Sequence, residues 1–158
     1  MPASTVYEAL INPRWVDPSG NLQNAYVGVL LSSASDALMD RLGMDAAYRA
    51  RTACTLFTLE THTHWLGQVK GSGAVEIDAH VLAFDRKRLH VAFELRAKGL
   101  PAVVATQECM YLHVHQGDKP SAVPFGEEAQ QAIRAFQALD VALPWAGPGS
   151  RAISVRSL

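Results

Sequence analysis

A short segment near the N-terminus, DPSGNLQN, places a carboxylate and three side-chain amides just before a long apolar stretch. The carboxylate is Asp17, and the amides are Asn21, Gln23 and Asn24. A carboxylate can attack a carbonyl carbon or deprotonate water, and a helix N-terminus offers free N–H groups that polarise a carbonyl. Gly20 would let a substrate approach the backbone closely. The purely structural alternative is that Asp17 closes a turn and Asn21 or Asn24 caps the helix.

A second titratable group, Glu60, lies within the predicted strand segment LFTLETHTHW. Because side chains alternate along a strand, Thr58, Glu60, His62 and His64 are expected on one face. A carboxylate in the middle of a strand is unusual, so Glu60 either assists in the chemistry or forms an ion pair at a sheet edge. This His-x-His pair and a second one further along the chain could bind metal, but local spacing fixes no third ligand. No metal site is therefore predicted.

Hydrophobic periodicity defines the elements that must position these groups. A long helix is predicted over residues 24–42, where apolar residues recur every four positions and Gly43 ends the pattern. A more polar helix is predicted over residues 127–139. Turn signals bound the predicted strands, which cover residues 6–16, 54–66, 74–84, 89–97 and 102–115. Residues 48–52 are predicted to form a loop.

The order of elements is strand, long buried helix, four consecutive strands and a surface helix. Consecutive strands joined by short turns favour an antiparallel sheet. A sheet wrapped around one long central helix is an α+β arrangement. We expect one domain over residues 1–140 and a loosely held tail, rich in Pro, Gly and Ser, over residues 141–158.

Composition restricts the classes of function. The chain has 158 residues, of which 49% are hydrophobic and 18% charged, with a formal net charge of -1. This charge argues against nucleic acid or an anionic membrane surface as a partner. The two cysteines, Cys54 and Cys109, lie in apolar stretches and are expected to be free thiols, which indicates a cytoplasmic protein. No signal peptide and no transmembrane span are predicted.

The segment DPSGNLQNAY and the order of elements resemble the hotdog-fold acyl-CoA thioesterases, in which Asp-x-x-Gly-His-x-Asn ends the first strand before the central helix. Asp17 and Gly20 match that motif. Further stretches resemble the betainyl-CoA and carnitinyl-CoA thioesterase subgroup: WVD, SDALMDRLGMDA, LFTLETH, FDRKRLHV, ATQECMYLHV and PFG. The chain departs from the subgroup at Asn21, where a His is usual, and at Gln23, which is often Asn.

The resemblance implies that Asp17 is the nucleophile or general base for thioester hydrolysis. It also implies that backbone N–H groups at the start of the central helix stabilise the oxyanion. Asn21 would hydrogen-bond the carbonyl or water, although an amide cannot exchange protons at neutral pH. In the hotdog dimer Glu60 would supplement Asp17 in the partner's site. No cofactor is implied, because CoA is part of the substrate, and a homodimer or tetramer is expected.

The resemblance also suggests roles in binding the substrate. Gly20, Asn24 and an aromatic cage around a trimethylammonium group would hold the acyl part. The aromatic candidates are Trp15, Tyr26, Phe57 and Trp65. The basic run Arg86, Lys87 and Arg88 would bind the CoA phosphates, unless it is simply a solvated turn. Two alternatives stay open: a thioesterase for another small or aromatic acyl-CoA, and a hotdog protein that binds acyl-CoA without cleaving it.

Overall fold

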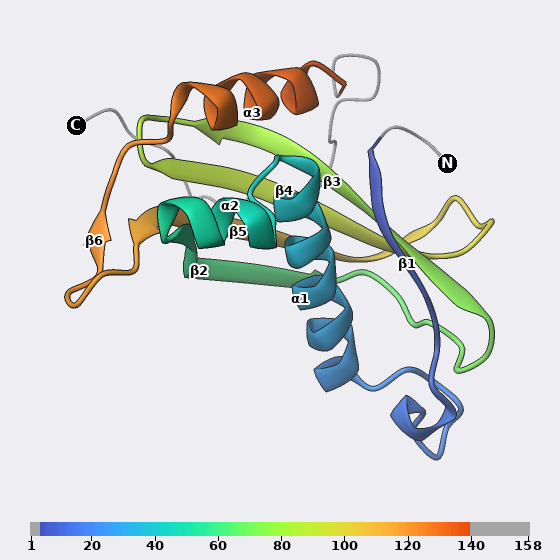
Figure 1. Cartoon of the computed structure of the whole chain (residues 1–158). Helices are drawn as coiled ribbons and strands as arrows, with labels where there is room; N and C mark the ends of the chain where they lie inside the picture. Colours follow the sequence, from blue (N-terminus) through green and yellow to red (C-terminus); the bar gives the residue numbers. More distant parts are fainter. Residues whose placement is uncertain (1–3, 140–158) are drawn as a thin grey trace.

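One face of a curved antiparallel sheet wraps around a single long helix (Figure 1). The computed structural model describes residues 4–139. The helix is α1 (Asn24–Arg41), and the strands of the main path lie in the order β1-β3-β4-β5-β2. The strands are β1 (Thr5–Leu10), β2 (Cys54–Trp65), β3 (Ala74–Phe84), β4 (Arg88–Ala97), β5 (Val103–His115) and the short β6 (Ser121–Ala122), which pairs with β5. The α+β hotdog arrangement predicted from the sequence is confirmed.

The core lies between α1 and the concave face of the sheet. Leu31 and Ala34 of α1 are fully buried, as are Leu89, Val91 and Phe93 of β4. The strict alternation of β4 explains this arrangement, since every second side chain points towards the helix. Burial of both α1 and β4 therefore fixes the helix against the sheet, and the position of the α1 N-terminus follows from it.

Two further helices complete the described part of the chain. α2 (Ala46–Thr52) follows α1, and α3 (Glu127–Leu139) packs near β3, where the Gln137 side chain donates to Val81 O at 3.2 Å. The prediction of a loop over residues 48–52 is wrong. The Asp45 side chain accepts a hydrogen bond from Tyr48 N and caps a helix too short to show periodicity.

The first predicted strand was too long. β1 ends at Leu10, and a 3-10 turn, η1 (Pro13–Trp15), follows it, with the Asn12 side chain accepting from Arg14 N. Pro13 fits the first position of such a turn but cannot donate to a sheet. No helix within residues 4–139 is long and apolar enough to cross a membrane. The expected tail over residues 141–158 lies outside the described residues, so the predicted division into domain and tail stays a prediction.

Candidate active site

Residues 17–21 form a tight hairpin between η1 and α1. Asp17 N donates to Asn21 O at 2.8 Å, and Gly20 N donates to Asp17 O at 2.9 Å. Gly20 has a φ of +80°, in the left-handed region that glycine adopts at low cost. The Asp17 carboxylate accepts from Asn21 N at 2.9 Å through Oδ1. Asp17 therefore closes the turn, as the structural alternative predicts, and this leaves its second oxygen without a partner among the described residues.

The loop between β2 and β3 supports this hairpin from one side. Leu22 N donates to Val69 O and Gly71 N donates to Gly20 O, each at 2.9 Å. A Cβ on Gly71 would lie 2.4 Å from the methyl groups of Val16, so only glycine fits there. The hairpin is thus held between α1 and the 67–73 loop. The sequence marked this loop only as a turn, by its three glycines.

Asp17 shares an open cavity of about 330 Å³ with the N-terminus of α1. Asn21, Gln23 and Asn24 also line it, as does Trp65 from the end of β2. The sequence did not single out the remaining lining residues, which are Leu22, Val27, Gly67, Gln68, Val69, Leu95, Val104 and Ala105. Because most of these are apolar side chains or backbone, nothing in their residue types pointed to a site.

The start of α1 is not capped by a side chain. Gln23 is the N-cap residue and makes no side-chain capping bond. The N–H groups of Asn24 and Ala25 have no acceptor among residues 4–139, whereas those of Tyr26 and Val27 point to Gln23 O. Unpaired N–H groups at a helix N-terminus bind anions and stabilise developing negative charge. Asp17 and Asn24, which carries one of these donors, line one cavity, which is the arrangement that attack on a carbonyl requires.

Asn21 is buried and occupies the position of the usual histidine. Its Oδ1 accepts from Lys70 Nζ at 3.3 Å. Since Asn21 lines the cavity, its amide N–H₂ group is the part of the side chain that is free to donate to a substrate. Lys70 thereby orients the Asn21 amide.

Glu60 does not line this cavity within its own subunit. A β-bulge between Thr58 and Glu60 shifts the register, so that Thr58 pairs with Tyr111 whereas Glu60 pairs with Met110. Neighbouring residues of β5 point to opposite faces, so the prediction that Thr58 and Glu60 share a face is wrong. Met110 pairs in turn with His90, on the convex face of the sheet away from α1.

The four aromatic candidates do not converge in one subunit. Trp65 lines the cavity, and Trp15 stacks on Tyr26 with ring centroids 5.3 Å apart. Phe57 pairs with Leu112 on the convex face of β2. It lies eight residues from Trp65, roughly 26 Å along an extended strand. A single subunit therefore offers only Trp65 directly to a ligand in the cavity.

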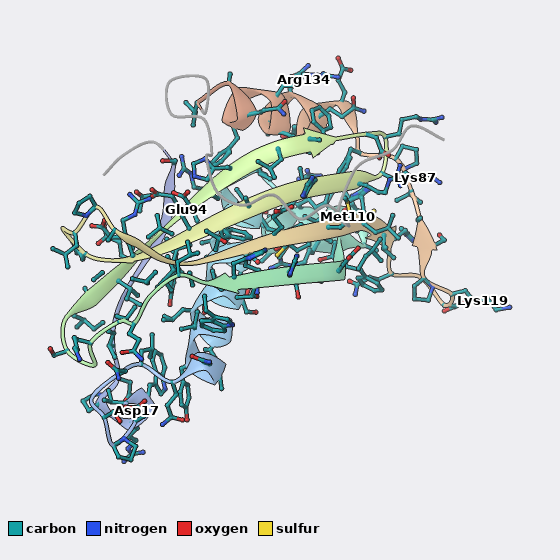
Figure 2. The ribbon with its side chains drawn as sticks, turned by 180° about the vertical axis from the view of Figure 1, so that it is seen from behind. Asp17, Lys87, Glu94, Met110, Lys119 and Arg134 are labelled. Carbon is teal, nitrogen blue, oxygen red and sulfur yellow. The ribbon has the colours of Figure 1, made fainter. Side chains whose placement is uncertain are left out.

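The basic run lies far from Asp17. Arg88 forms an ion pair with Asp85, with Nη2 and Oδ2 2.6 Å apart. Figure 2 shows Lys87 at the opposite end of the subunit from Asp17. Within residues 4–139, no group of three or more His, Cys, Asp or Glu side chains could hold a metal ion.

Comparison with known proteins gives the family context of this cavity. The model of the thioesterase-like superfamily matches residues 11–133. A betainyl-CoA thioesterase from Pseudomonas aeruginosa is 39% identical over 140 residues, which cover 89% of this chain and 87% of the relative. A candidate thioesterase from Pseudomonas putida KT2440 is 33% identical, with a TM-score of 0.78 and coverage of 100% and 99% of the two chains.

A Staphylococcus aureus protein in complex with CoA has the same fold. Its TM-score is 0.81 at 20% identity, and the match covers 100% of this chain and 98% of that one. At this level of identity the likeness extends to the fold alone. The match to the family model over residues 11–133, in contrast, includes both the Asp17 hairpin and the strands that frame the cavity.

Proposed function

The chain belongs to the thioesterase-like superfamily and is a thioesterase, and we propose that it hydrolyses a short, polar acyl-CoA such as betainyl-CoA or carnitinyl-CoA. One structural observation carries this proposal: Asp17 and the uncapped N-terminus of α1 line the same cavity. The identity to a betainyl-CoA thioesterase over most of the chain supports the choice of acyl group.

In the proposed reaction the thioester carbonyl oxygen accepts from the free N–H groups at the start of α1. Negative charge develops on that oxygen as the tetrahedral intermediate forms, and the helix N-terminus stabilises it. Asn21 donates from its amide to the carbonyl or to the attacking water. The acyl C–S bond breaks as the intermediate collapses, and the CoA sulfur takes up the proton that the attacking water loses, either by way of Asp17 or from solvent.

Asp17 promotes attack on the carbonyl carbon in one of two ways. It either attacks the carbonyl carbon directly, giving an anhydride that water then hydrolyses, or it deprotonates the water that attacks. The second carboxylate oxygen is available for both, because the hairpin occupies only Oδ1. Hydrolysis in water labelled with oxygen-18 under single-turnover conditions tests the first route: label in Asp17 identifies an anhydride that water opens at the Asp17 carboxyl carbon. Label in the released acid alone is the result of the general-base route or of water attack on the acyl carbonyl of the anhydride.

The proposed assembly is a homodimer formed through β2. This strand lies at the edge of the sheet, and an edge strand of this length is a template for pairing with another strand. Its exposed apolar side chains include Leu59 at 55% and Trp65 at 47% exposure, which favours burial against a second copy. A homodimer would also bring Glu60 and Phe57 of one subunit towards the partner, where the proposed supporting roles of both residues can be tested.

Two further parts of the proposal concern CoA and the compartment. Arg86 and Lys87 are proposed to bind CoA phosphates, and Arg88 is the least available of the three because of its ion pair with Asp85.

The free, buried thiols Cys54 and Cys109 support a reducing compartment, which for this protein we take to be the cytoplasm.

Thiol release from a panel of acyl-CoA substrates tests the function. The panel contains betainyl-CoA, carnitinyl-CoA, acetyl-CoA, 3,3-dimethylbutyryl-CoA and 4-hydroxybenzoyl-CoA. We expect the highest kcat/KM for the two cationic acyl groups. A preference for the aromatic thioester would contradict the proposed substrate, and binding of all five without thiol release would contradict hydrolysis itself.

A further inference from the structure

A second hollow, of about 300 Å³, lies further along α1, between the helix and strands β2 and β5. Hydroxyl groups dominate its polar lining, from Ser32, Ser35, Thr58, Thr61 and Tyr111. The Ser35 and Tyr111 oxygens are 2.5 Å apart, so these two hydroxyls pair with each other. The mechanism proposed for Asp17 within one subunit uses none of these residues.

Asp36 is the one charged side chain among the residues that line this hollow. The Asp36 carboxylate makes no ion pair within the part of the chain that the structure describes. The carboxylate of Asp78, on the sheet, is in contrast paired with Arg96. Burial is the main cause that raises the pKa of the nearby Tyr111, and the negative charge of Asp36 adds to it. The hollow is therefore negative and polar, and it would favour a cation over an anion.

Asp36 cannot serve the Asp17 cavity of its own subunit. Asn24 and Asp36 are twelve residues apart on one helix, roughly 18 Å at about 1.5 Å per residue. In a betainyl thioester the carbonyl carbon and the cationic nitrogen are separated by two single bonds, about 2.5 Å. A short acyl group held at the α1 N-terminus would thus end well before its own Asp36.

Pairing of two β2 strands removes this separation. In an antiparallel pair the two strands run in opposite directions, so the end of one β2, with Trp65, meets the beginning of the other, near Leu56 and Thr58. Trp65 lines the Asp17 cavity, whereas Leu56 and Thr58 line the second hollow. In such a dimer the two-fold axis would turn the second hollow of each subunit towards the Asp17 cavity of its partner.

From this arrangement we infer that Asp36 of one subunit recognises the positive charge of an acyl group whose thioester lies at Asp17 of the other. This inference rests on the proposed function. It assigns to the second hollow a class of ligand, a short acyl chain that carries a quaternary ammonium group. The hydroxyls around Asp36 give the cation a polar surface with no competing positive charge among the lining residues.

The first test compares Asp36→Asn with Asp40→Asn, a matched substitution on the same helix that does not line the hollow. The measurement is the ratio of kcat/KM for betainyl-CoA to that for 3,3-dimethylbutyryl-CoA, an uncharged isostere, after division by the spontaneous hydrolysis rates. We expect Asp36→Asn to lower this ratio about five- to thirty-fold, the range for one opposite charge near a partly solvated site. Asp40→Asn should leave the ratio within about twofold.

The second test asks whether Asp36 acts across the dimer. Chains carrying Asp17→Asn and Asp36→Asn are co-expressed with different affinity tags, and the mixed dimer is purified. Its one functional Asp17 faces the native Asp36 of the other chain if the hollow acts across the interface. The mixed dimer should then show the wild-type ratio of kcat/KM values. The Asp36→Asn homodimer should show the lowered ratio, and the Asp17→Asn homodimer should have lost most of its activity.

The outcomes of these tests separate a failure of the proposed role of Asp36 from a failure of the proposed function. A mixed dimer with the low ratio of the Asp36→Asn parent, or an Asp36→Asn enzyme with an unchanged ratio, overturns the role of Asp36 and leaves the thioesterase proposal standing. An active monomer overturns the role of Asp36 across the dimer in the same way. A wild-type enzyme with no preference for the cationic acyl group overturns both the substrate and the site.

Discussion

The backbone N–H of Asn21 donates to Oδ1 of Asp17 at 2.9 Å, which fixes the carboxylate within a five-residue hairpin before α1. The two readings of the DPSGN segment, structural turn and catalytic group, are therefore compatible. One oxygen closes the turn, and the other is free to react. The hairpin keeps this second oxygen beside the cavity without requiring a flexible side chain to be ordered when the substrate binds.

Gly71→Ala should displace the hairpin. The added Cβ would meet the Val16 methyl groups at 2.4 Å, and overpacking of this kind typically costs about 1–3 kcal/mol. We expect a lower melting temperature and a larger loss of kcat than of substrate affinity, because Asp17 moves relative to α1. Val16→Ala in the same chain should restore part of the lost melting temperature and part of the lost kcat. Gly126→Ala, where no atom lies within 4 Å of the added Cβ, is the matched control.

Tyr48→Phe should destabilise the fold without touching the active site. The Tyr48 hydroxyl and His113 Nε2 are 2.8 Å apart, and His113 Nδ1 lies 3.0 Å from Val123 O. Removal of the hydroxyl leaves a buried ring nitrogen unsatisfied, which costs about 1–3 kcal/mol. Chemical denaturation should show this loss, whereas Tyr7→Phe should not. Equal stability of the two variants would mean that solvent replaces the lost bond.

Stability should fall as the pH rises above 9. Burial is the main cause that raises the pKa of Cys109 to about 11 from its usual 9.0, and burial also raises that of Tyr111. Both groups stay protonated in the fold while they ionise in the unfolded chain. Their contribution is therefore complete below the unfolded pKa values and declines as the pH rises towards the folded ones. Cys109→Ala should give a flatter decline between pH 9 and 11, measured by denaturant unfolding, and an unchanged slope would contradict this assignment.

Trp65→Leu should reduce selectivity for a cationic acyl group. Trp65 lines the Asp17 cavity, and a cation over an aromatic face gains about 0.5–2 kcal/mol, or roughly a two- to thirty-fold preference. The corrected ratio of kcat/KM for betainyl-CoA and its neutral isostere should therefore shrink. Phe84→Leu, which removes a ring of β3 that contacts Arg134 and lines neither cavity, should leave the ratio unchanged. An equal effect of both substitutions would argue against a direct role for Trp65.

The sequence predicted the long-range fold well where periodicity was strong. The helix at residues 24–42 and the strands at 74–84 and 89–97 agree with α1, β3 and β4 to within one residue at each end. Periodicity failed for short elements. α2 has only seven residues, and its signal was the Asp45 cap, whereas β1 was extended through Pro13 because apolar residues continued past its true end.

The site could be predicted only in part, because its geometry depends on the pairing register of the strands and on the path of the backbone in the loops. Asp17 and the amides could be found from their spacing in the chain. The face of Glu60 could not, since one bulge in β2 reverses the alternation. Asp36 lies in one of the stretches that resemble the subgroup, but its residue type and spacing assigned it no role, and the 67–73 loop was marked only as a turn. Their places in the two cavities follow from how α1, β2 and β5 pack.

The most direct measurement of the central claim is single-turnover thioester hydrolysis by Asp17→Asn. Asn keeps an acceptor for the Asn21 N–H group, so the hairpin and the melting temperature should be preserved, but it can neither attack nor take a proton. We predict that the rate constant for chemistry falls by about two orders of magnitude or more, as expected for loss of a nucleophile or general base. A folded variant that retains more than roughly a tenth of the wild-type rate would contradict the account, and Asp17 would then serve only the turn.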